Sequence, residues 1–370
     1  MQVSEPSSII PLSLGAEWVL MAGDLKQLPP TIKTEVARRL LGYDGIALHE
    51  LGVLEVQLKR QYRMHPAIRE FPSRQFYDNQ LFEDPACMPS MDVPQPSKHG
   101  CGFKWPSEKR GKGEYPIAFF DVQQAAGDPG LEEKVGTSYR NKDEASLVLQ
   151  LMMAMACDPS VRSIFILTPY KLQADYITKC LVNGRATLDE MRAAGTFHAT
   201  EVKAHTADGF QGHEADVVII STVRSSRLGH VQDERRLNVA ITRARRALLI
   251  VGHARTLKTG SSPKCPSANC WPALLEHIKG HHGYVDGAEV EEYGTLDCAL
   301  PQEMAPAITP TSVVTAAAAA GPSGGRGGPP IQSTDMGAAL LQLGLGAAPG
   351  RLWAEMEERE DAIAAGFDEY

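Results

Sequence analysis

Short apolar runs alternate with helix-forming segments through the middle of this 370-residue chain, and this alternation constrains its fold most. The runs, each rich in Ile, Val, Leu or Phe, lie at residues 115–122, 163–169, 216–221 and 248–251. Runs of this length and composition are typical of strands buried on both faces. Residues 141–156 and 173–182 have the composition of helices and lie between them. The pattern predicts an α/β fold with a parallel sheet covered by helices.

The N-terminal part carries a further strand pattern. Residues 18–22 form an apolar run that ends at Gly23 and Asp24, which predicts a buried parallel strand with functional residues at its carboxyl end. We expect a helix over residues 34–41. Residues 84–114, rich in Pro, Ser, Lys and Gly, are expected to form a loop or insertion.

Charge is spread unevenly over the chain, whose formal net charge is −8. Residues 283–370 hold 14 acidic and 3 basic residues, which leaves 31 acidic and 34 basic residues in the body. A mildly basic body with an acidic tail is compatible with an anionic ligand. Residues 301–350, dominated by Ala, Gly, Pro and Ser, are expected to be disordered, with a short acidic helix over 352–365.

The location of the protein is suggested only by general features. Seven scattered cysteines without framework spacing favour reduced thiols, in the cytoplasm or nucleus. No apolar run approaches the ~18 residues of a membrane span, and no signal peptide is recognisable. We therefore expect no membrane association, and possible protein partners for the acidic tail.

A basic cluster precedes the last apolar run. Arg243 lies near the end of the stretch RRLNVAITRA at residues 235–244, Arg245 follows it, and both come just before the apolar residues 247–252. A guanidinium fixed at the edge of a sheet suits recognition of a transferring phosphoryl group, because it stays charged and binds oxyanions bidentately.

Four segments together resemble helicase motifs. They are GDLKQLPP at residues 23–30, QYRMHP at 61–66, DGFQGHE at 208–214, and the stretch ending at Arg243. In this order they resemble motifs III to VI of superfamily 1 helicases, most nearly the up-frameshift/senataxin-like branch, over residues 1–280. The resemblance implies a RecA-like P-loop NTPase fold and ATP-driven translocation on single-stranded RNA or DNA.

The resemblance also predicts a division of the chain. Residues 1–54 would be the remnant of a first RecA-like motor domain, 55–282 a nearly complete second one, and 283–370 a mostly disordered tail. No G-x-x-x-x-G-K-[ST] phosphate loop occurs in the sequence. We therefore expect the C-terminal half of an ATP-dependent helicase core, with the phosphate loop and the Asp-Glu pair that holds Mg²⁺ outside this chain. Alone it should hydrolyse ATP negligibly.

Six residues match the family's ATP-site positions: Gln27, Tyr62, Arg63, Gly212, Glu214 and Arg243. By resemblance, Gln27 senses the γ-phosphate, Tyr62 packs on the base or sugar, and Arg63 reaches the γ-phosphate. Gly212 permits close approach of the backbone and Glu214 contacts the ribose. Arg243 is the arginine finger, while Arg236 and Arg245 are expected to form supporting ion pairs.

A second set matches the family's contacts to the nucleic-acid backbone: Thr168, Pro169, Tyr170, Thr206, Asp208 and Ser221. Short hydroxyl and amide contacts suit sequence-independent tracking along phosphates. The motifs do not separate RNA from DNA, although the branch resembled favours RNA. For residues 168–173, a plain strand-to-helix turn stays an alternative.

Other functions remain open from the sequence alone. A free-standing RecA-like module that binds RNA or protein is the main alternative, and a helicase–nuclease is a weaker one. Cys265 and Cys270 with His277 and His281 invite a zinc site. The C-x₄-C spacing is looser than the usual zinc pattern, so we expect an ordinary loop before a helix over 271–278, and no metal held by this chain. His65 and Pro66 are expected to shape the chain.

Overall fold

The computed structural model describes much of the chain. The described residues are 5–15, 18, 20, 22–30, 32, 56–83, 91–122, 132–210, 212–259, 269–294 and 301–304. All of them belong to the first of two compact units, Met1–Pro310, and the second unit is Thr311–Tyr370. The helices predicted at 34–41 and 352–365, residue Gln211, and most of the segment 301–350 lie outside the described residues.

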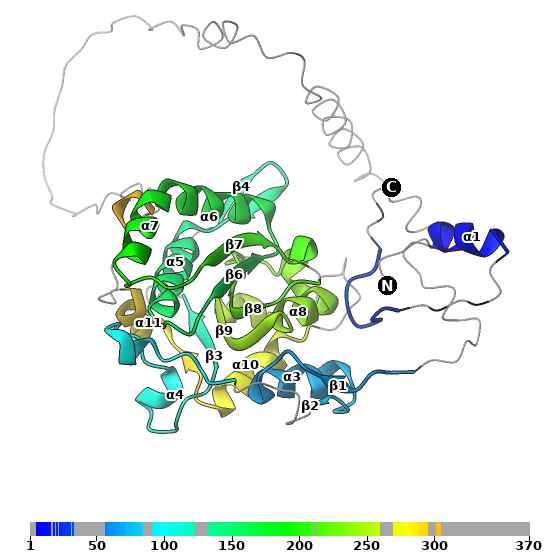
Figure 1. Cartoon of the computed structure of the whole chain (residues 1–370), viewed down its shortest axis with the longest axis horizontal. Coiled ribbons are helices and arrows are strands. Elements are labelled where there is room, and N and C mark those ends of the chain that lie inside the picture. The colour runs from blue at the N-terminus through cyan, green and yellow to red at the C-terminus, as the bar shows by residue number, and fades with distance from the viewer. Residues whose placement is uncertain are drawn as a thin grey trace, which may run out of the picture. The chain divides into compact units, whose positions relative to one another are not determined.

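A six-stranded, wholly parallel sheet forms the centre of the fold (Figure 1). In sheet order its strands are β10 (Tyr284–Val285), β3 (Ile117–Asp121), β9 (Ala244–Gly252), β8 (Ala215–Ser221), β6 (Ser163–Thr168) and β7 (Glu201–Thr206). The four apolar runs from residue 115 onward therefore form neighbouring strands, and the predicted α/β class is confirmed. β7 was not predicted, because it is an edge strand with exposed polar residues and no continuous apolar run.

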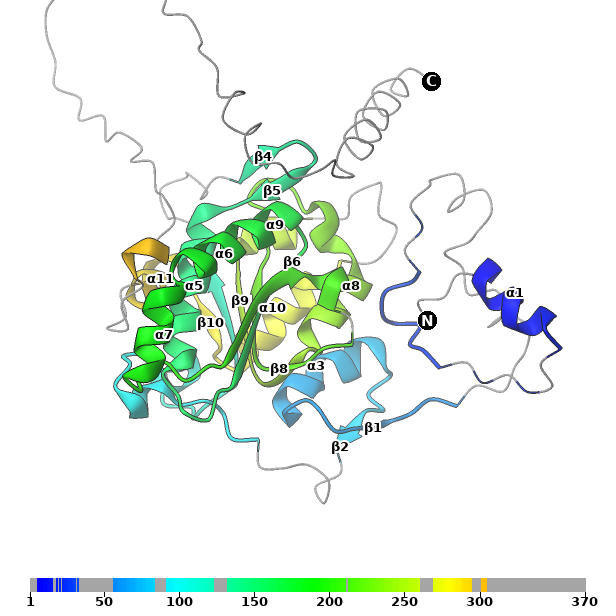
Figure 2. The ribbon, with the colours of Figure 1, turned by 45° about the horizontal axis from the view of Figure 1, so that its top comes forward.

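Two hydrophobic clusters cover the two faces of the sheet. Because successive strand residues point to opposite faces, Ile164 and Ile166 join one cluster whereas Phe165 and Leu167 join the other. The first cluster includes α5 (Lys142–Ala156) and α6 (Lys171–Asn183). The second includes α3 (Pro66–Phe76), α8 (Glu234–Ile241), α9 (Ala254–Lys258) and α10 (Trp271–Gly280). Figure 2 shows α5 and α6 opposite α3 and α10 across the strands.

Local sequence fixes where the main helices begin. Asn141 caps α5, and its side-chain oxygen accepts a hydrogen bond from the Glu144 backbone N–H at 3.0 Å. His65 caps α3 in the same way, with Nδ1 accepting from the Ala67 N–H at 3.1 Å, and Pro66 occupies the first helical position. The prediction that His65 and Pro66 shape the chain is confirmed.

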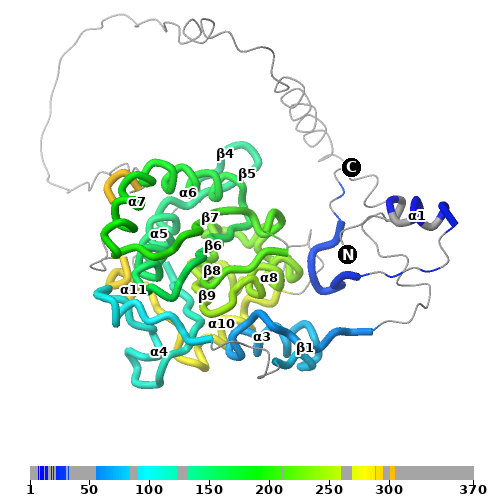
Figure 3. Tube along the Cα trace, in the orientation of Figure 1, coloured from blue at the N-terminus to red at the C-terminus, as the bar shows by residue number. Residues whose placement is uncertain are grey.

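α3 lies beside segments that are distant in the sequence. It packs against α8 and β9, and Figure 3 shows it next to α10. The short parallel pair β1 (Arg60–Gln61) and β2 (Phe82–Glu83) precedes and follows it. The His65 N–H donates to the Arg245 carbonyl at 2.7 Å, which joins the start of α3 to β9.

The remaining elements are small. They are α1 (Glu5–Ser13), η2 (Pro96–His99), α4 (Pro106–Lys109), the antiparallel hairpin of β4 (Glu133–Val135) and β5 (Ser138–Arg140), α7 (Arg185–Ala193), η3 (Ala207–Phe210), η4 (Gly229–Gln232), α11 (Gly287–Gly294) and η5 (Gln302–Met304). Among the described residues, no helix is long and apolar enough to cross a membrane.

Three sequence-based expectations need correction. Trp18 and Leu20 are 92% and 96% exposed and belong to no strand, since no described strand pairs with them, so the buried strand predicted at 18–22 is wrong for these residues. The segment 91–114 is not a simple loop, because Phe103 and Trp105 enter the core. Finally, β10 and α11 pack on the sheet beyond residue 282, so the folded body extends further than the predicted boundary.

Candidate functional site

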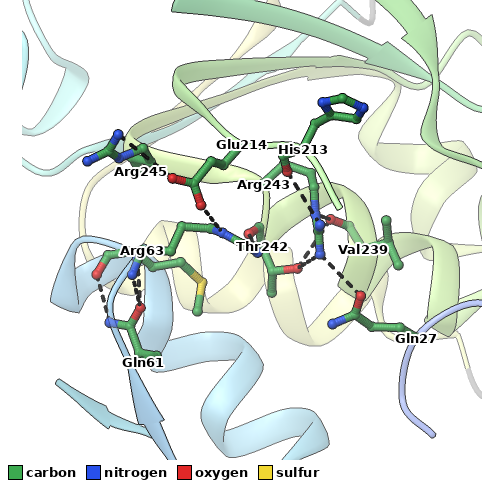
Figure 4. A network of polar contacts seen from close by, with 10 residues as sticks. Gln27, Gln61, Arg63, His213, Glu214, Val239, Thr242, Arg243 and Arg245 are labelled. Atoms are coloured by element: carbon green, nitrogen blue, oxygen red, sulfur yellow. Dashed lines mark hydrogen bonds and ion pairs between the residues drawn. The ribbon is translucent and has the colours of Figure 1, made fainter. Parts of the chain in front are cut away.

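Four segments meet at one edge of the fold, as the close view in Figure 4 shows. They are the loop at residues 22–30, the segment after β1, the residues before β8, and the turn from α8 into β9. Gln27, Arg63, Glu214 and Arg243, all predicted as site residues, lie within this cluster and contact one another directly or through Thr242. The structure thus brings together residues separated by up to 216 positions.

Arg243 lies at the centre of the cluster and is only 2% exposed. Its Nε donates to the Val239 carbonyl at 2.9 Å, and its Nη2 donates to the Gln27 side-chain oxygen at 3.2 Å. Among the described residues no carboxylate forms an ion pair with it. Burial, together with the nearby positive charge of Arg63, lowers the pKa of Arg243 to about 10. The guanidinium therefore stays charged at neutral pH but lacks an anionic partner.

Arg63 lies beside Arg243, and the positive charge of Arg63 is only partly neutralised. Its Nε donates to Glu214 at 2.7 Å and its Nη1 donates to the Thr242 carbonyl at 3.0 Å. Glu214 also pairs with Arg245 at 3.7 Å, so one carboxylate serves two arginines. The Arg63–Glu214 pair is 30% and 41% exposed, and such pairs exchange partners at little cost in free energy. Arg236 pairs with Asp208 and Asp233, so both expected supporting arginines form ion pairs.

The loop at residues 24–27 is held by a network of polar contacts. Asp24 accepts from the Lys26 N–H at 2.9 Å and from the Gln27 amide at 2.7 Å, so it supports this turn. Tyr77 at the end of α3 donates its hydroxyl to Asp24 at 2.7 Å. Asn238 on α8 donates to Tyr77 and to the Lys26 carbonyl, each at 2.9 Å. The network fixes Gln27 against Arg243.

Two predicted site residues are open to solvent. Tyr62 is 54% exposed, so its ring is free to stack on a planar ligand. Gly212 has a φ of 93°, and a Cβ built on it meets nothing within 4 Å. A residue with a side chain would be strained there, while glycine leaves room for close approach to the backbone.

Part of the predicted nucleic-acid set lies at the carboxyl ends of neighbouring strands. Thr168 and Thr206 are register partners at the ends of β6 and β7, and Pro169 follows. Thr168 is buried, and its hydroxyl accepts from the Tyr170 N–H at 3.3 Å, whereas Thr206 is partly exposed. Asp208 is exposed and forms a bidentate pair with Arg236, at 3.0 and 3.2 Å.

The structure argues against direct roles for Tyr170 and Ser221. Ser221 is fully buried, where it donates to Glu144 at 2.7 Å and accepts from Gln173 at 3.0 Å. Tyr170 is 3% exposed, and its hydroxyl accepts from Arg224 at 3.2 Å. Both side chains therefore form hydrogen bonds inside the protein, Ser221 with residues of α5 and α6 and Tyr170 with Arg224 after β8.

Comparison with known proteins agrees with this geometry. Residues 47–255, more than half of the chain, match a family described as AAA domain, and residues 1–35 match a second family with the same description. A regulator of nonsense transcripts 1 homolog from Arabidopsis thaliana is 36% identical over 298 residues. The chain belongs to the superfamily 1 helicases of the up-frameshift type.

Other members of this helicase family are similarly close. An uncharacterized ATP-dependent helicase of Methanocaldococcus jannaschii is 32% identical, and the DNA polymerase alpha-associated DNA helicase A of Saccharomyces cerevisiae is 30% identical. The matches cover 77%, 70% and 73% of this chain, but only 21%, 35% and 39% of the Arabidopsis, Methanocaldococcus and Saccharomyces proteins. The chain thus spans well under half of each of these helicases.

Sequence reasoning missed several residues of the site. Tyr77 and Asn238 were not predicted, although Asn238 lies inside the stretch RRLNVAITRA. The Thr242 carbonyl, which accepts from Arg63, has no sequence signature of its own. A network that joins three segments becomes visible only when α3 and α8 are placed side by side.

Proposed function

We propose that this chain supplies one wall of the ATP site, and part of the strand-binding surface, of an ATP-driven helicase that moves along single-stranded nucleic acid. The observation that carries the proposal is the pair of neighbouring guanidinium groups, Arg243 and Arg63. Arg243 is buried, charged and without an anionic partner among the described residues. A phosphoryl group beside it would supply the missing negative charge.

The other residues around these arginines fit the rest of a nucleotide. The exposed ring of Tyr62 suits stacking on the base, and Gly212 leaves space beside the backbone. Glu214 is placed to exchange Arg63 for a ribose hydroxyl, because its pair with Arg63 is solvent-exposed. Gln27, held by Asp24, offers an amide to the γ-phosphate or to its attacking water.

Mg²⁺ and the phosphate loop are assigned to groups outside this chain. The sequence has no G-x-x-x-x-G-K-[ST] segment. Among the described residues of the cluster, three arginines (Arg63, Arg243 and Arg245) accompany two carboxylates. Glu214 already pairs with Arg63 and Arg245, and Asp24 already accepts from Gln27 and Tyr77. Such a site suits phosphate oxygens better than a cation. We therefore propose that ATP is hydrolysed only slowly by this chain alone.

The strand-binding surface is proposed to lie at the carboxyl ends of β6 and β7. An open groove of about 810 Å³ runs along β7 between α6 and α7, and it reaches Thr206 at the carboxyl end of β7. Its lining includes Thr206, the basic residues Lys171, Arg185, Arg192 and Lys203, and the acidic residues Asp175 and Asp189. Asp189 pairs with Arg185 and Arg192, and Lys203 pairs with Glu201, so a bound strand would compete with these exposed ion pairs. Basic side chains along a groove suit the phosphate backbone of a single strand. RNA is the favoured strand, since a relative is named a regulator of nonsense transcripts, although another is named a DNA helicase.

Photo-crosslinking tests this assignment even where affinity is weak. An azido-adenine nucleotide should label the peptide that contains Tyr62, and excess ATP should protect it. A photoreactive oligoribonucleotide should label the peptides that contain residues 168–171 and 203–208. Labelling by the nucleotide that falls mainly elsewhere, or that ATP does not reduce, would contradict the proposed ATP site. Labelling of the strand peptides alone would favour the non-catalytic module.

A further inference from the structure

A second cluster of polar groups lies between α3 and α10, apart from the ATP-site residues. It consists of Glu70 on α3, His277 on α10 and His281, the residue that caps the end of α10. One ligand atom of each residue lies within 4.8 Å of the other two. We propose that Glu70, His277 and His281 bind one divalent transition-metal ion, with Zn²⁺ as the first candidate.

The ligand types and their spacing suit zinc. Two imidazole nitrogens and a carboxylate oxygen form a common three-residue zinc set, completed by water. His277 and His281 are four positions apart, so their side chains lie on the same side of the helix. Tetrahedral ligands about 2.0–2.1 Å from zinc are roughly 3.4 Å apart. The His281 Nε2 and Glu70 carboxylate are already 3.8 Å apart, so a small closure completes the geometry.

Neighbouring aromatic rings hold both histidines in place. The His281 ring stacks on Tyr115, with centroids 4.5 Å apart and an angle of 6°. His277 is 7% exposed, lies against Phe71, and its Nε2 is 3.1 Å from the Tyr115 hydroxyl. The two rings are thus positioned before a metal arrives.

Arg74 opposes a cation at this cluster. Its Nη2 lies 3.3 Å from the His277 Nδ1, and a guanidinium can only donate in that contact. The side chain lies at an exposed position, so it can turn away into solvent. Repulsion between Arg74 and a bound ion should weaken metal binding. Removing Arg74 should therefore raise the affinity for the metal, whereas removing a ligand should lower it.

The site differs from the zinc pattern in the sequence. Cys270 is buried and lies 3.5 Å from Gln75 and 3.9 Å from Glu234, away from the histidine pair, and Cys265 lies outside the described residues. The structure assigns Glu70 as the third ligand. A metal there would tie α3, which follows Tyr62 and Arg63, to α10.

Calorimetric titration of the chelator-stripped chain with ZnCl₂ tests the proposal. We expect one ion per chain, and a loss of at least about 10-fold in affinity for Glu70→Gln and for His281→Ala, both at partly exposed positions. Glu276→Gln is the matched control, since Glu276 is an exposed carboxylate on the same helix outside the cluster, and it should bind like wild type.

Arg74→Ala separates a built site from chance surface binding. Removing the competing guanidinium should tighten zinc binding by roughly 10-fold. Co²⁺ should give the absorption bands of a tetrahedral site in wild type and in Arg74→Ala, but not in His281→Ala. Zinc binding that is absent, or that is unchanged in Glu70→Gln and His281→Ala, would overturn the proposal.

Discussion

At the residue scale, the molecule buries ionisable groups and relies on specific partners for each. Arg243 keeps its charge although it is 2% exposed, because four protein oxygens accept its hydrogen bonds at 2.9–3.4 Å. Glu144 is the acidic counterpart on the other face of the sheet. Burial raises its pKa to about 8, although it accepts from Ser221 and from the Val223 N–H. Val223 has a φ of 70°, which is strained for a β-branched residue, and this hydrogen bond helps to hold it.

Glu144 gives a pH prediction. Its pKa is 4.5 when solvated and about 8 when folded, so between these values the folded chain keeps a proton that the unfolded chain has lost. Wild-type stability should therefore fall as pH rises from 4.5 to 8. Glu144→Gln mimics the protonated acid and lacks this dependence. Relative to wild type, its free energy of unfolding should increase by roughly 3 kcal/mol over that range.

Urea unfolding of both proteins at pH 5 and pH 8 measures this difference. Asp143→Asn, one position earlier in α5 and exposed, serves as the control and should show no comparable trend. A constant difference between Glu144→Gln and wild type across the range would show that the carboxylate is already ionised in the folded protein.

At the element scale, periodic features of the sequence predicted the sheet well. The apolar runs that became β3, β6, β8 and β9 are buried on both faces, so their composition alone identifies them. β7 and β10 were missed because one is a polar edge strand and the other has two residues. The run at 18–22 has the same composition as the true strands, yet composition does not tell whether neighbouring strands are present to cover it.

The contact between β3 and the segment before β10 gives a test of packing. A Cβ built on Gly283 would lie 2.3 Å from the Ile117 carbonyl oxygen, a backbone atom that cannot move aside. The Gly283 carbonyl also accepts from the Phe119 N–H at 3.0 Å. Gly283→Ala should therefore lower the free energy of unfolding by about 1–3 kcal/mol.

Gly280→Ala is the matched control for this substitution. Gly280 ends α10, three positions earlier, and its Cβ would meet nothing within 4 Å. The free energy of unfolding of Gly280→Ala should be unchanged or should rise by up to about 1 kcal/mol, since alanine has a higher helix propensity than glycine. Chemical denaturation of the two variants under one condition compares them. Equal effects would refute close packing of the Gly283 segment against β3.

At the scale of the whole molecule, the fold gathers the cluster that we propose as one wall of the ATP site from segments far apart in the chain. The motif residues of this cluster were recognisable in the sequence because the four segments that carry them resemble the motifs of superfamily 1 helicases. The partners that hold them, such as Tyr77 and Asn238, were not recognisable, since hydrogen-bonding residues are common and only the packing of α3 on α8 unites them. The burial of Tyr170 and Ser221 was likewise not predictable, because the residue types tyrosine and serine do not show whether a side chain lies inside the protein.

The central claim is that Arg243 recognises the γ-phosphate of ATP. It predicts that the chain binds ATP more tightly than ADP. It also predicts that Arg243→Ala removes this preference without lowering the affinity for ADP. Arg243→Lys retains the positive charge but not the planar guanidinium with its two parallel donors, so this variant should keep part of the preference for ATP. Arg235→Ala removes an exposed arginine from the same region and should leave the preference intact.

Equilibrium titration with fluorescent ATP and ADP analogues, up to millimolar concentrations, is the most direct measurement. Circular dichroism spectra of each variant check that it is folded. The account predicts a preference for ATP in wild type and in Arg235→Ala that is lost in Arg243→Ala. An equal preference in Arg243→Ala and wild type, or no saturable binding of either nucleotide, would contradict it.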